Sequence, residues 1–360
     1  MLGKSGIGAY VGQAIPRLPK FMPRAEFVAF GGRIPGFKTV PIRAGIYSLA
    51  EQIELPVAAA GLDLDVFFAP HYNAPLAAPA PLAIFVYDLI HLIFRRQLPR
   101  PRWFSYLYAR TQIRLACARA RVILTDSENT KRDLVRMLKV PGGKIRVIPL
   151  AVEDSMRRVR DQGRLASFRR AHGLAEPYVL FVGNLKPHKN PEGLIRVLAA
   201  MRDRRARLVF VGRGTPAYVA GLKALAGRLG LGKRVTFAGT PDRQTLRHYY
   251  SAAAALAFPS FYEGFGLPPL EAFACGTPVV ASNAASIPEV VGDAAVSLRP
   301  GDVGGFARAL DAVLTRPALR RRLIAAGFRR VRRFSWDRTA ELTADALADA
   351  AYGREVGARR

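Results

Sequence analysis

The sequence predicts an α/β protein with two domains, each built on a parallel β-sheet. The chain has 360 residues, which is more than one hydrophobic core usually serves. Short apolar runs typical of buried strands alternate with longer helical stretches over residues 26–149, and further strand-like runs follow over 178–298. This alternation favours parallel sheets, because each crossover helix returns the chain to the same edge of the sheet.

The first half of the chain supplies the elements of one such domain. We expect strands over Glu26–Phe30, Leu64–Phe68, Leu82–Tyr87, Arg121–Thr125 and Ile145–Pro149. We expect helices over Ile46–Ala60, Arg102–Ala120 and Glu128–Leu138. Ser127 precedes the last of these helices, and serine is a favoured N-cap residue.

A polar, arginine-rich connector over Glu153–Gly173 separates the two halves, and we expect the domain boundary there. The predicted domains are residues 1–158 and 172–336, followed by a helix over 337–352. Strands of the second domain are expected over Tyr178–Val182, Arg207–Val211, Val235–Ala238, Ala254–Phe258, Pro278–Ala281 and Ala295–Leu298.

The composition is that of a globular protein, with 50% hydrophobic and 23% charged residues. Cys117 and Cys275 lie far apart, so neither a disulfide framework nor a zinc spacing is expected, and a reducing cytoplasm suits them. The longest apolar stretch, Pro75–Phe94, is broken by prolines, Asp88 and His91. Residues before Gly12 lack the apolar core of a secretory signal. We therefore expect a cytoplasmic protein, soluble or peripheral on the inner face of the membrane.

The formal net charge of +28 is the unusual number of this chain, and arginine supplies most of the excess. Such a field attracts polyanions and anionic membrane surfaces alike. The sequence has no zinc finger, no RNA-recognition signature and no interleaved aromatic and basic platform. Nucleic acid is therefore a less economical explanation of the positive charge than a nucleotide-sugar or a lipid headgroup. The arginine clusters over 157–170, 202–207 and 320–333 also fit a plain solvated surface.

Residues 259–278, PSFYEGFGLPPLEAFACGTP, carry the main functional signal. Glu263 stands directly before a Gly-Phe-Gly turn, and Glu271 is expected in the first turn of the short helix that follows. Prolines suit the opening of that helix, and Gly276 suits the position just past its end. The N–H groups and positive dipole end of such a helix bind phosphate at the carboxyl edge of a sheet. The segment therefore predicts a site for a phosphorylated, hydroxyl-rich ligand.

This segment resembles the Glu-x7-Glu signature of the retaining glycosyltransferases of family 4. Between Tyr178 and Pro300 the motifs YVLFVGNLKPHKNPEGLI, LVFVG, VTFAG, VVASNAASIPEVVGDAA and LRP follow in the order of that family's donor domain. The resemblance implies a GT-B fold, with two Rossmann-like domains facing each other across a cleft and the last helix crossing back to the first domain. It also implies transfer of a sugar from a nucleotide-sugar to an acceptor, with retention of anomeric configuration.

The resemblance assigns roles to the motif residues. Glu263 would touch the transferred sugar and Glu271 the ribose, and Lys189 would bind the donor phosphates. The N–H groups of Gly264, Phe265, Gly266 and Leu267 would hold the leaving diphosphate. Where many relatives carry a second phosphate-binding arginine this chain has Asn184, and Lys186 or His188 could stand in for it.

In the first domain, Gly6 and Gly8 look like the family's glycine-rich turn at the donor. Relatives have a β-strand before this turn, so the resemblance leads us to expect that the first strand of this domain is missing. A parallel sheet loses a central strand only at the cost of unpaired N–H and C=O groups. The missing strand reflects either a start codon assigned too late or a chain in which a neighbouring strand fills the gap.

Asp88 and His91 are the first domain's catalytic candidates. Asp88 could hold a sugar hydroxyl or assist deprotonation of the acceptor, and His91 could shuttle a proton near neutral pH. Many relatives have a histidine directly before that aspartate, and here Tyr87 takes its place, so the histidine's role cannot be copied. His71 matches a motif on the acceptor side. The pair Asp63 and Asp65 is read as a solvated turn, and neither a metal nor a cofactor other than the donor substrate is expected.

The sequence thus predicts a metal-independent hexosyltransferase, mannosyltransferase-like, that uses a nucleoside diphosphate sugar and a glycan or lipid-linked acceptor in the synthesis of cell-surface polysaccharide. Two alternatives stay open. One is a catalytically inactive GT-B scaffold that docks on anionic membrane. The other is a sugar-nucleotide epimerase on the same fold.

Overall fold

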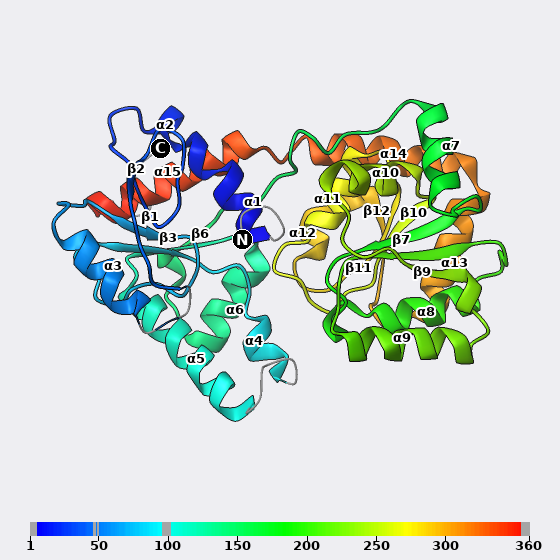
Figure 1. Cartoon of the computed structure of the whole chain (residues 1–360), viewed down its shortest axis with the longest axis horizontal. Coiled ribbons are helices and arrows are strands. Elements are labelled where there is room, and N and C mark those ends of the chain that lie inside the picture. The colour runs from blue at the N-terminus through cyan, green and yellow to red at the C-terminus, as the bar shows by residue number, and fades with distance from the viewer. Residues whose placement is uncertain (1–5, 46–47, 49, 96–101, 354–360) are drawn as a thin grey trace. The chain divides into compact units, whose positions relative to one another are not determined.

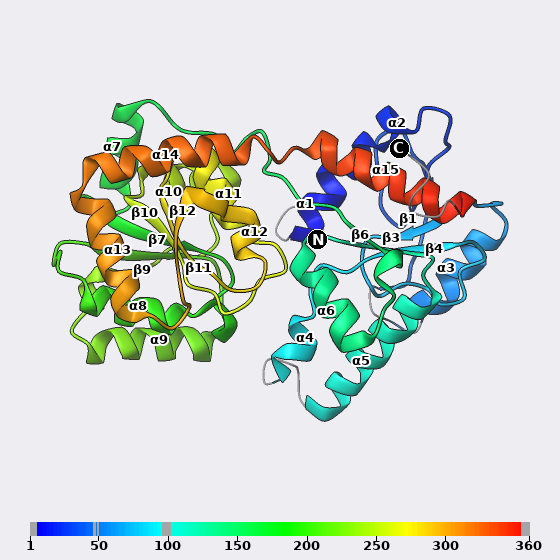
Figure 2. The same cartoon turned by 180° about the vertical axis from the view of Figure 1, so that it is seen from behind.

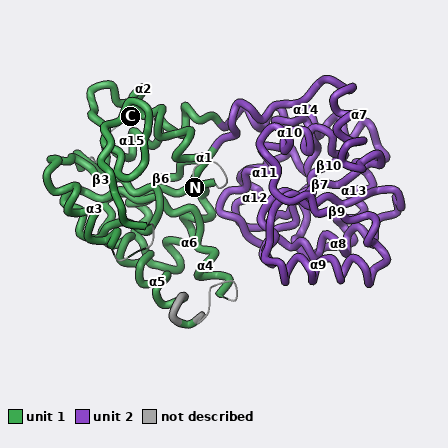
Figure 3. Tube along the Cα trace, in the orientation of Figure 1, with its two compact units in different colours: residues 1–150, 335–360 green, residues 151–334 purple. Residues whose placement is uncertain are grey.

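A computed structural model describes residues 6–45, 48, 50–95 and 102–353 of the chain. The chain divides into two compact units, residues 1–150 with 335–360 and residues 151–334 (Figure 3). The division falls just before the expected connector, and residues 162–171 of that connector form a helix. The last helix belongs to the first unit, as the resemblance implies.

The described residues of unit 1 form two separate parallel sheets (Figure 1). The larger has the order β3-β4-β5-β6 and the smaller pairs β1 with β2. The strands are β1 (Val28–Phe30), β2 (Lys38–Val40), β3 (Phe67–Ala69), β4 (Leu82–Phe85), β5 (Val122–Thr125) and β6 (Ile145–Val147). All five expected strands are present in shorter form, and β2 was not expected. Its residues are mostly exposed, so hydrophobic patterning gave no signal for it.

The helices of unit 1 include the three that were expected. They are α1 (Gly6–Gln13), α2 (Leu18–Phe21), α3 (Glu51–Ala60), α4 (Ile90–Ile93), α5 (Arg102–Arg119), α6 (Glu128–Leu138) and α15 (Trp336–Tyr352), with short 3-10 turns η1 (Ile15–Arg17) and η3 (Gly142–Lys144). Ser127 caps α6 as predicted, because its Oγ accepts from the N–H of Thr130 at 3.1 Å.

The prediction that Gly6 and Gly8 form a turn is wrong, because both lie in α1. Tertiary packing outweighs the low helix propensity of glycine here. Tyr10 on this helix is fully buried, and its ring packs at a tilt against that of Phe85, with 4.7 Å between the ring centroids. Its hydroxyl shares a 2.9 Å hydrogen bond with that of Thr343. The strand that relatives have before this segment would fall on residues outside those described.

Helix α15 ties the C-terminal part of unit 1 to its N-terminal part. Its contacts reach α2 and β5, and its N-cap residue is Ser335. The Thr339 hydroxyl donates to the carbonyl of Pro149 at 2.7 Å, and Asp337 pairs with Lys20 at 2.5 Å. Trp336, the first residue of α15, is buried.

Unit 2 is a three-layer α/β domain around one six-stranded parallel sheet of order β12-β11-β10-β7-β8-β9 (Figure 2). Its strands are β7 (Tyr178–Val182), β8 (Arg207–Val211), β9 (Val235–Phe237), β10 (Ala255–Phe258), β11 (Val279–Ser282) and β12 (Ala295–Leu298). Each of the six lies where the sequence predicts a strand. The central strands are buried along their whole length, which explains their continuous apolar runs.

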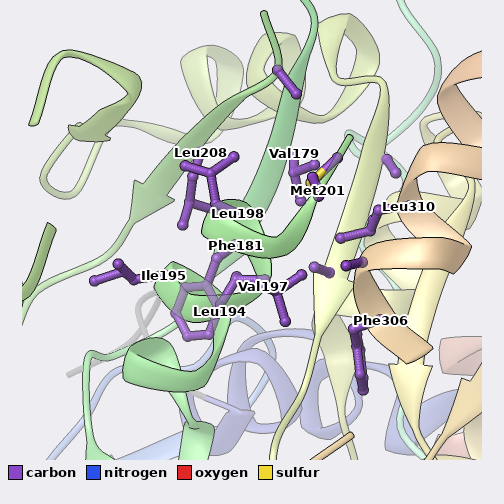
Figure 4. Packing of buried hydrophobic residues seen from close by; sticks show 14 of the residues in the cluster. Val179, Phe181, Leu194, Ile195, Val197, Leu198, Met201, Leu208, Phe306 and Leu310 are labelled. Carbon is purple, nitrogen blue, oxygen red and sulfur yellow. The ribbon is translucent and has the colours of Figure 1, made fainter. Parts of the chain in front are cut away.

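The helices of unit 2 cover both faces of this sheet. They are α7 (Gln162–Ala171), α8 (Pro191–Ala200), α9 (Pro216–Arg228), α10 (Arg243–Ala252), α11 (Leu267–Ala274), α12 (Ile287–Val291), α13 (Val303–Thr315) and α14 (Pro317–Val331), with 3-10 turns η4 (Pro187–Lys189), η5 (Gly232–Arg234) and η6 (Gly292–Ala294). One core cluster joins β7 and β8 to α8 and α13 through side chains such as Phe181, Leu194 and Phe306 (Figure 4). This packed layer holds the strand ends in fixed positions.

Both cysteines, Cys117 and Cys275, are buried free thiols, as their spacing predicts. Burial raises the pKa of each thiol to about 12, so neither is a reactive thiolate near neutral pH. Of the helices that the structure describes, none is long and apolar enough to span a bilayer.

Candidate functional site

The sheet of unit 2 reverses its winding between β7 and β10. From β7 the chain moves outward to β8 and β9, and then returns to β10 on the other side before continuing to β11 and β12. In open parallel sheets, ligands bind beyond the carboxyl ends of the strands at such a reversal. The loop after β7 carries Lys189, and the loop after β10 carries Glu263. The topology therefore brings the two strongest candidates of the sequence to one place.

Lys189 and Glu263 form a close ion pair. The Nζ atom of Lys189 lies 2.6 and 2.7 Å from the two carboxylate oxygens of Glu263. The exposed fractions of the two side chains are 15% and 10%. A cation and an anion this deep in a protein stabilise each other and are costly to separate.

The backbone around this pair leaves room for the lysine. Gly183 at the end of β7 has a φ of 144°, and a Cβ atom there would lie 3.4 Å from the Cδ of Lys189. Only glycine adopts this conformation readily. Asn190, in the left-handed region, follows Lys189 and caps α8 through a 3.1 Å bond from the N–H of Gly193. The lysine stem thus lies between a glycine and a capped helix.

Buried serine hydroxyls fix the loop that carries Glu263. Ser260 donates to Oε1 of Glu263 at 2.7 Å, and Ser286 donates to the carbonyls of Glu263 and Phe265 at 2.9 Å each. Ser282 donates to the carbonyl of Ser260 at 2.6 Å. The loop is therefore ordered by the protein itself, which is the condition for a preorganised site.

Helix α11 begins as the motif predicts. Gly266 is its N-cap, with a φ of 109°, and the prolines of Leu267-Pro-Pro fall in the first turn. Gly276, with a φ of 73°, stands just past its end. One detail of the prediction is wrong: Glu271 is the fifth residue of α11 and lies beyond its first turn, because the helix starts at Leu267.

Glu271 is held by two residues that lie outside the 259–278 segment, Arg243 and Tyr250. Its Oε1 lies 2.7 Å from Arg243, and its Oε2 accepts from the hydroxyl of Tyr250 at 2.7 Å. Arg243 also forms an ion pair with Glu153, with 2.5 Å between the guanidinium nitrogen and the carboxylate oxygen. Burial, and then the charge of Glu271, raise the pKa of Tyr250 well above its ordinary value, so this phenol stays a donor.

The second phosphate-binding cation remains a prediction. Lys186 is exposed, whereas His188 is 3% exposed and its backbone carbonyl accepts from the N–H of Phe261 at 2.7 Å. A hollow of about 430 Å³ opens nearby, lined by Pro187, Asn190, Glu192, Gly193, Arg196, Tyr218, Phe261, Gly301 and Val303. Glu263 and Glu271 are not among the residues that line this hollow.

The candidates of unit 1 fall into two places. Gly6 and Gly8 lie in α1, whereas Asp88, His91 and His71 follow the ends of β3 and β4. Oδ1 of Asp88 accepts from the N–H of Ile90 at 2.9 Å, which fixes the start of α4, and His91 on that helix is exposed. Tyr87, which takes the place of the relatives' histidine, has a buried hydroxyl with no hydrogen-bond partner among the described residues.

The structure brings His71 and His91 close enough to interact. Burial, and then the charge of His91, lower the pKa of His71 to about 4. The Nδ1 atom of His71 accepts from the N–H of Asn73 at 3.1 Å, and Asn73 in turn donates to Glu51 at 2.7 Å. His71 is therefore neutral near pH 7, and protonation at Nδ1 would break this contact.

This gives a pH dependence with a definite sign. An unfolded chain binds a proton at His71 near pH 6.5, whereas the folded chain does so only near pH 4, so stability falls as the pH drops between these values. Between pH 7 and 4, His71→Asn, which keeps an acceptor for Asn73, is expected to lose less stability than the wild type, by on the order of 2 kcal/mol. Urea unfolding at each pH measures the difference, and parallel curves for the two proteins would contradict it.

Two family models match most of the chain. Residues 15–155 match the model for Glycosyltransferase Family 4, and residues 166–330 match the model for Glycosyl transferases group 1. The chain belongs to family 4 of the glycosyltransferases.

Curated relatives of this family 4 member include several bacterial enzymes. O-antigen chain mannosyltransferase B of Escherichia coli is 34% identical over 232 residues, which cover 63% of this chain and 60% of that protein. D-inositol 3-phosphate glycosyltransferase of Streptomyces avermitilis is 33% identical over 260 residues, which cover 68% and 55%. The chain thus spans between 55% and 60% of the length of these relatives.

Solved structures show the GT-B fold of the chain. Sucrose-phosphate synthase from Thermosynechococcus elongatus has a TM-score of 0.80 at 22% identity, covering 97% of this chain and 94% of that one. Anabaena HepE, solved in complex with UDP and glucose, has a TM-score of 0.74 at 21% identity, covering 96% and 98%. The fold expected of a family 4 glycosyltransferase, two Rossmann-like domains with parallel sheets, is confirmed.

Proposed function

We propose that this protein is a retaining hexosyltransferase that moves a mannose-like sugar from a nucleoside diphosphate to a glycan or lipid-linked acceptor in the synthesis of cell-surface polysaccharide. The observation that carries the proposal is the Lys189–Glu263 pair at the winding reversal of the unit 2 sheet. Membership of family 4 and the mannosyltransferase names of several relatives support the choice of chemistry and sugar.

In this proposal the ion pair opens when the donor binds. Lys189 turns its ammonium toward the diphosphate, and Glu263 then accepts from hydroxyls of the sugar. The N–H groups of Gly264 to Leu267, at the positive end of α11, stabilise the negative charge that grows on the diphosphate as the bond from sugar C1 breaks. The serine contacts of the loop keep its backbone in place during this exchange.

Glu271 is proposed to hold the ribose hydroxyls, with Arg243 and Tyr250 fixing its carboxylate. The acceptor hydroxyl forms the new bond to C1, and its proton passes to Asp88, with His91 as the shuttle to solvent. Aspartate and histidine are suited to this work near neutral pH. We propose that the reaction needs no metal ion, since lysine and N–H groups carry the charge of the diphosphate.

A panel of radiolabelled nucleoside diphosphate sugars, incubated with the purified protein and a bacterial lipid extract, tests the proposal. Transfer or slow hydrolysis from one donor, lost in Glu263→Gln while that variant still folds, supports it. Interconversion of one sugar nucleotide into its epimer would instead support the epimerase. Absence of any turnover together with binding to anionic vesicles would support the inactive scaffold.

A further inference from the structure

Helix α5 of unit 1 exposes large apolar side chains to solvent. Trp103 is 71% exposed, Leu107 54%, Leu115 47% and Tyr108 46%. At 100° per residue these four positions lie on one side of the helix, whereas Ile113, Ala116 and Cys117 on the other side pack into the core of unit 1. The helix is labelled in Figures 1 and 2. Exposed apolar side chains gathered on one helix face indicate an interaction surface.

The same face carries arginine and no acid. Arg110 and Arg114 are exposed, and the whole of α5 lacks aspartate and glutamate. Around the helix, Arg114 lies between Trp103 and Leu107, and Arg110 lies beside Trp103 at the edge of the apolar face. Next to it, the guanidinium of Arg95 stacks over the ring of Tyr106, 3.9 Å from its centre, and donates to its hydroxyl at 2.8 Å. Arg95 is thereby held beside the helix as a further cation.

Other basic helices of the protein lack this combination. Helix α14 exposes Arg321, Arg322 and Arg329, and none of its large apolar side chains is exposed. Such a surface is adequately explained by solvation. Solvation explains exposed arginines, but it does not explain why the large apolar side chains of Trp103, Leu107 and Leu115 are exposed beside arginines on α5.

We propose that the α5 face, made of Trp103, Leu107, Tyr108, Arg110, Arg114 and Leu115, docks the protein on the surface of an anionic lipid bilayer. Leucine and tryptophan enter the boundary between headgroups and acyl chains, tyrosine lies at headgroup level, and the arginines pair with lipid phosphates. A protein of net charge +28 is drawn to such a surface from solution.

Charge argues against a second copy of the chain as the occupant. A symmetric dimer through this face would bring two copies of Arg110 and Arg114 together without a carboxylate on α5 to neutralise them. A bilayer of anionic lipid supplies apolar depth and negative charge on one surface. The docking rests on the proposed function in one respect: a lipid-linked acceptor would give the protein a reason to bind membrane. Vesicle binding measures the docking by itself, without any sugar transfer.

The test uses the full chain at physiological salt, with vesicles of phosphatidylcholine and phosphatidylglycerol and, separately, of phosphatidylcholine alone. Arg110→Ala/Arg114→Ala is expected to weaken binding to the anionic vesicles roughly 10- to 30-fold. Leu107→Ser/Leu115→Ser is expected to weaken it at least about tenfold, since the inserted apolar area is lost. Matched controls are Arg321→Ala/Arg322→Ala on α14 and Ile53→Ser/Val57→Ser on α3, each expected to change binding less than about twofold.

Tryptophan fluorescence gives an independent measurement. The chain has two tryptophans, and Trp336 is buried whereas Trp103 is exposed. Brominated lipid is expected to quench the emission of Trp103, and Trp103→Phe should abolish that quenching. Equal loss of binding in the α14 control, or binding without quenching, would overturn the proposal. So would a dimer in analytical ultracentrifugation that Leu107→Ser/Leu115→Ser dissociates without changing vesicle binding.

Discussion

Lys189→Met is expected to lower the rate of sugar transfer by a factor of about 10²–10³, because it removes the ammonium proposed to stabilise the leaving diphosphate. The same substitution is expected to lower the free energy of unfolding by about 3–5 kcal/mol, since it leaves the carboxylate of Glu263 buried beside an apolar side chain. Chemical denaturation and steady-state kinetics measure the two effects separately.

The double variant Lys189→Met/Glu263→Gln separates structure from chemistry. An uncharged amide no longer needs the ammonium, and Ser260 still has an oxygen to donate to. Most of the lost stability is therefore expected to return, while the transfer rate stays low. Lys186→Met, in the same loop but exposed, is the matched control and should change stability by no more than about 0.5 kcal/mol.

Binding of a nucleoside diphosphate without sugar, measured by calorimetry, completes the comparison. If Lys189 contacts the phosphates, Lys189→Met weakens this binding. Lys186→Met tests whether the exposed Lys186 is the second phosphate-binding cation. Unchanged affinity and turnover in a well-folded Lys189→Met protein would leave the ion pair a purely structural contact.

The elements of unit 2 were predictable because its strands are short apolar runs between glycine and proline signals. A parallel strand that is buried on both faces has such a continuous apolar sequence. The two ends of α11 were predictable for a similar reason: Gly266 before the helix and Gly276 after it stand where the backbone has positive φ. Local sequence determines these features, so patterns of a few residues are enough to find them.

Other features depend on distant parts of the chain. Arg243 opens α10, 28 residues before Glu271, and only the folded sheet brings it to that carboxylate and to Glu153. The pairing of Lys189 with Glu263 spans 74 residues, although the order of the strands already placed both at one edge. The helix at Gly6–Gln13 was missed because glycine signals a turn locally, whereas the burial of Tyr10 decides the conformation.

Arg243 is the second residue whose substitution is expected to lower stability strongly. Its guanidinium joins Glu271 at 2.7 Å and Glu153 at 2.5 Å, so Arg243→Leu leaves two carboxylates facing each other without a cation. Because the arginine side chain is 37% exposed, water offsets part of the cost, and we expect a loss of about 2 kcal/mol in the free energy of unfolding. Arg243→Lys should recover only part of the lost stability. Lysine restores the positive charge, but its ammonium lacks the planar fork that reaches both carboxylates.

The effect on ligand binding follows from the proposed role of Glu271. Without Arg243 its carboxylate is held by Tyr250 alone, so the affinity for a nucleoside diphosphate is expected to fall roughly tenfold, the scale of one lost charge-assisted hydrogen bond. A deoxyribose analogue should then lose much less affinity on going from wild type to Arg243→Leu, because it lacks a hydroxyl that Glu271 would hold. Arg247→Leu, on the same helix but bonded to the carbonyl of Arg157, is the control for general damage to α10. Equal losses for the ribose and deoxyribose ligands would show that Arg243 supports the fold of the site without orienting Glu271 toward the nucleotide.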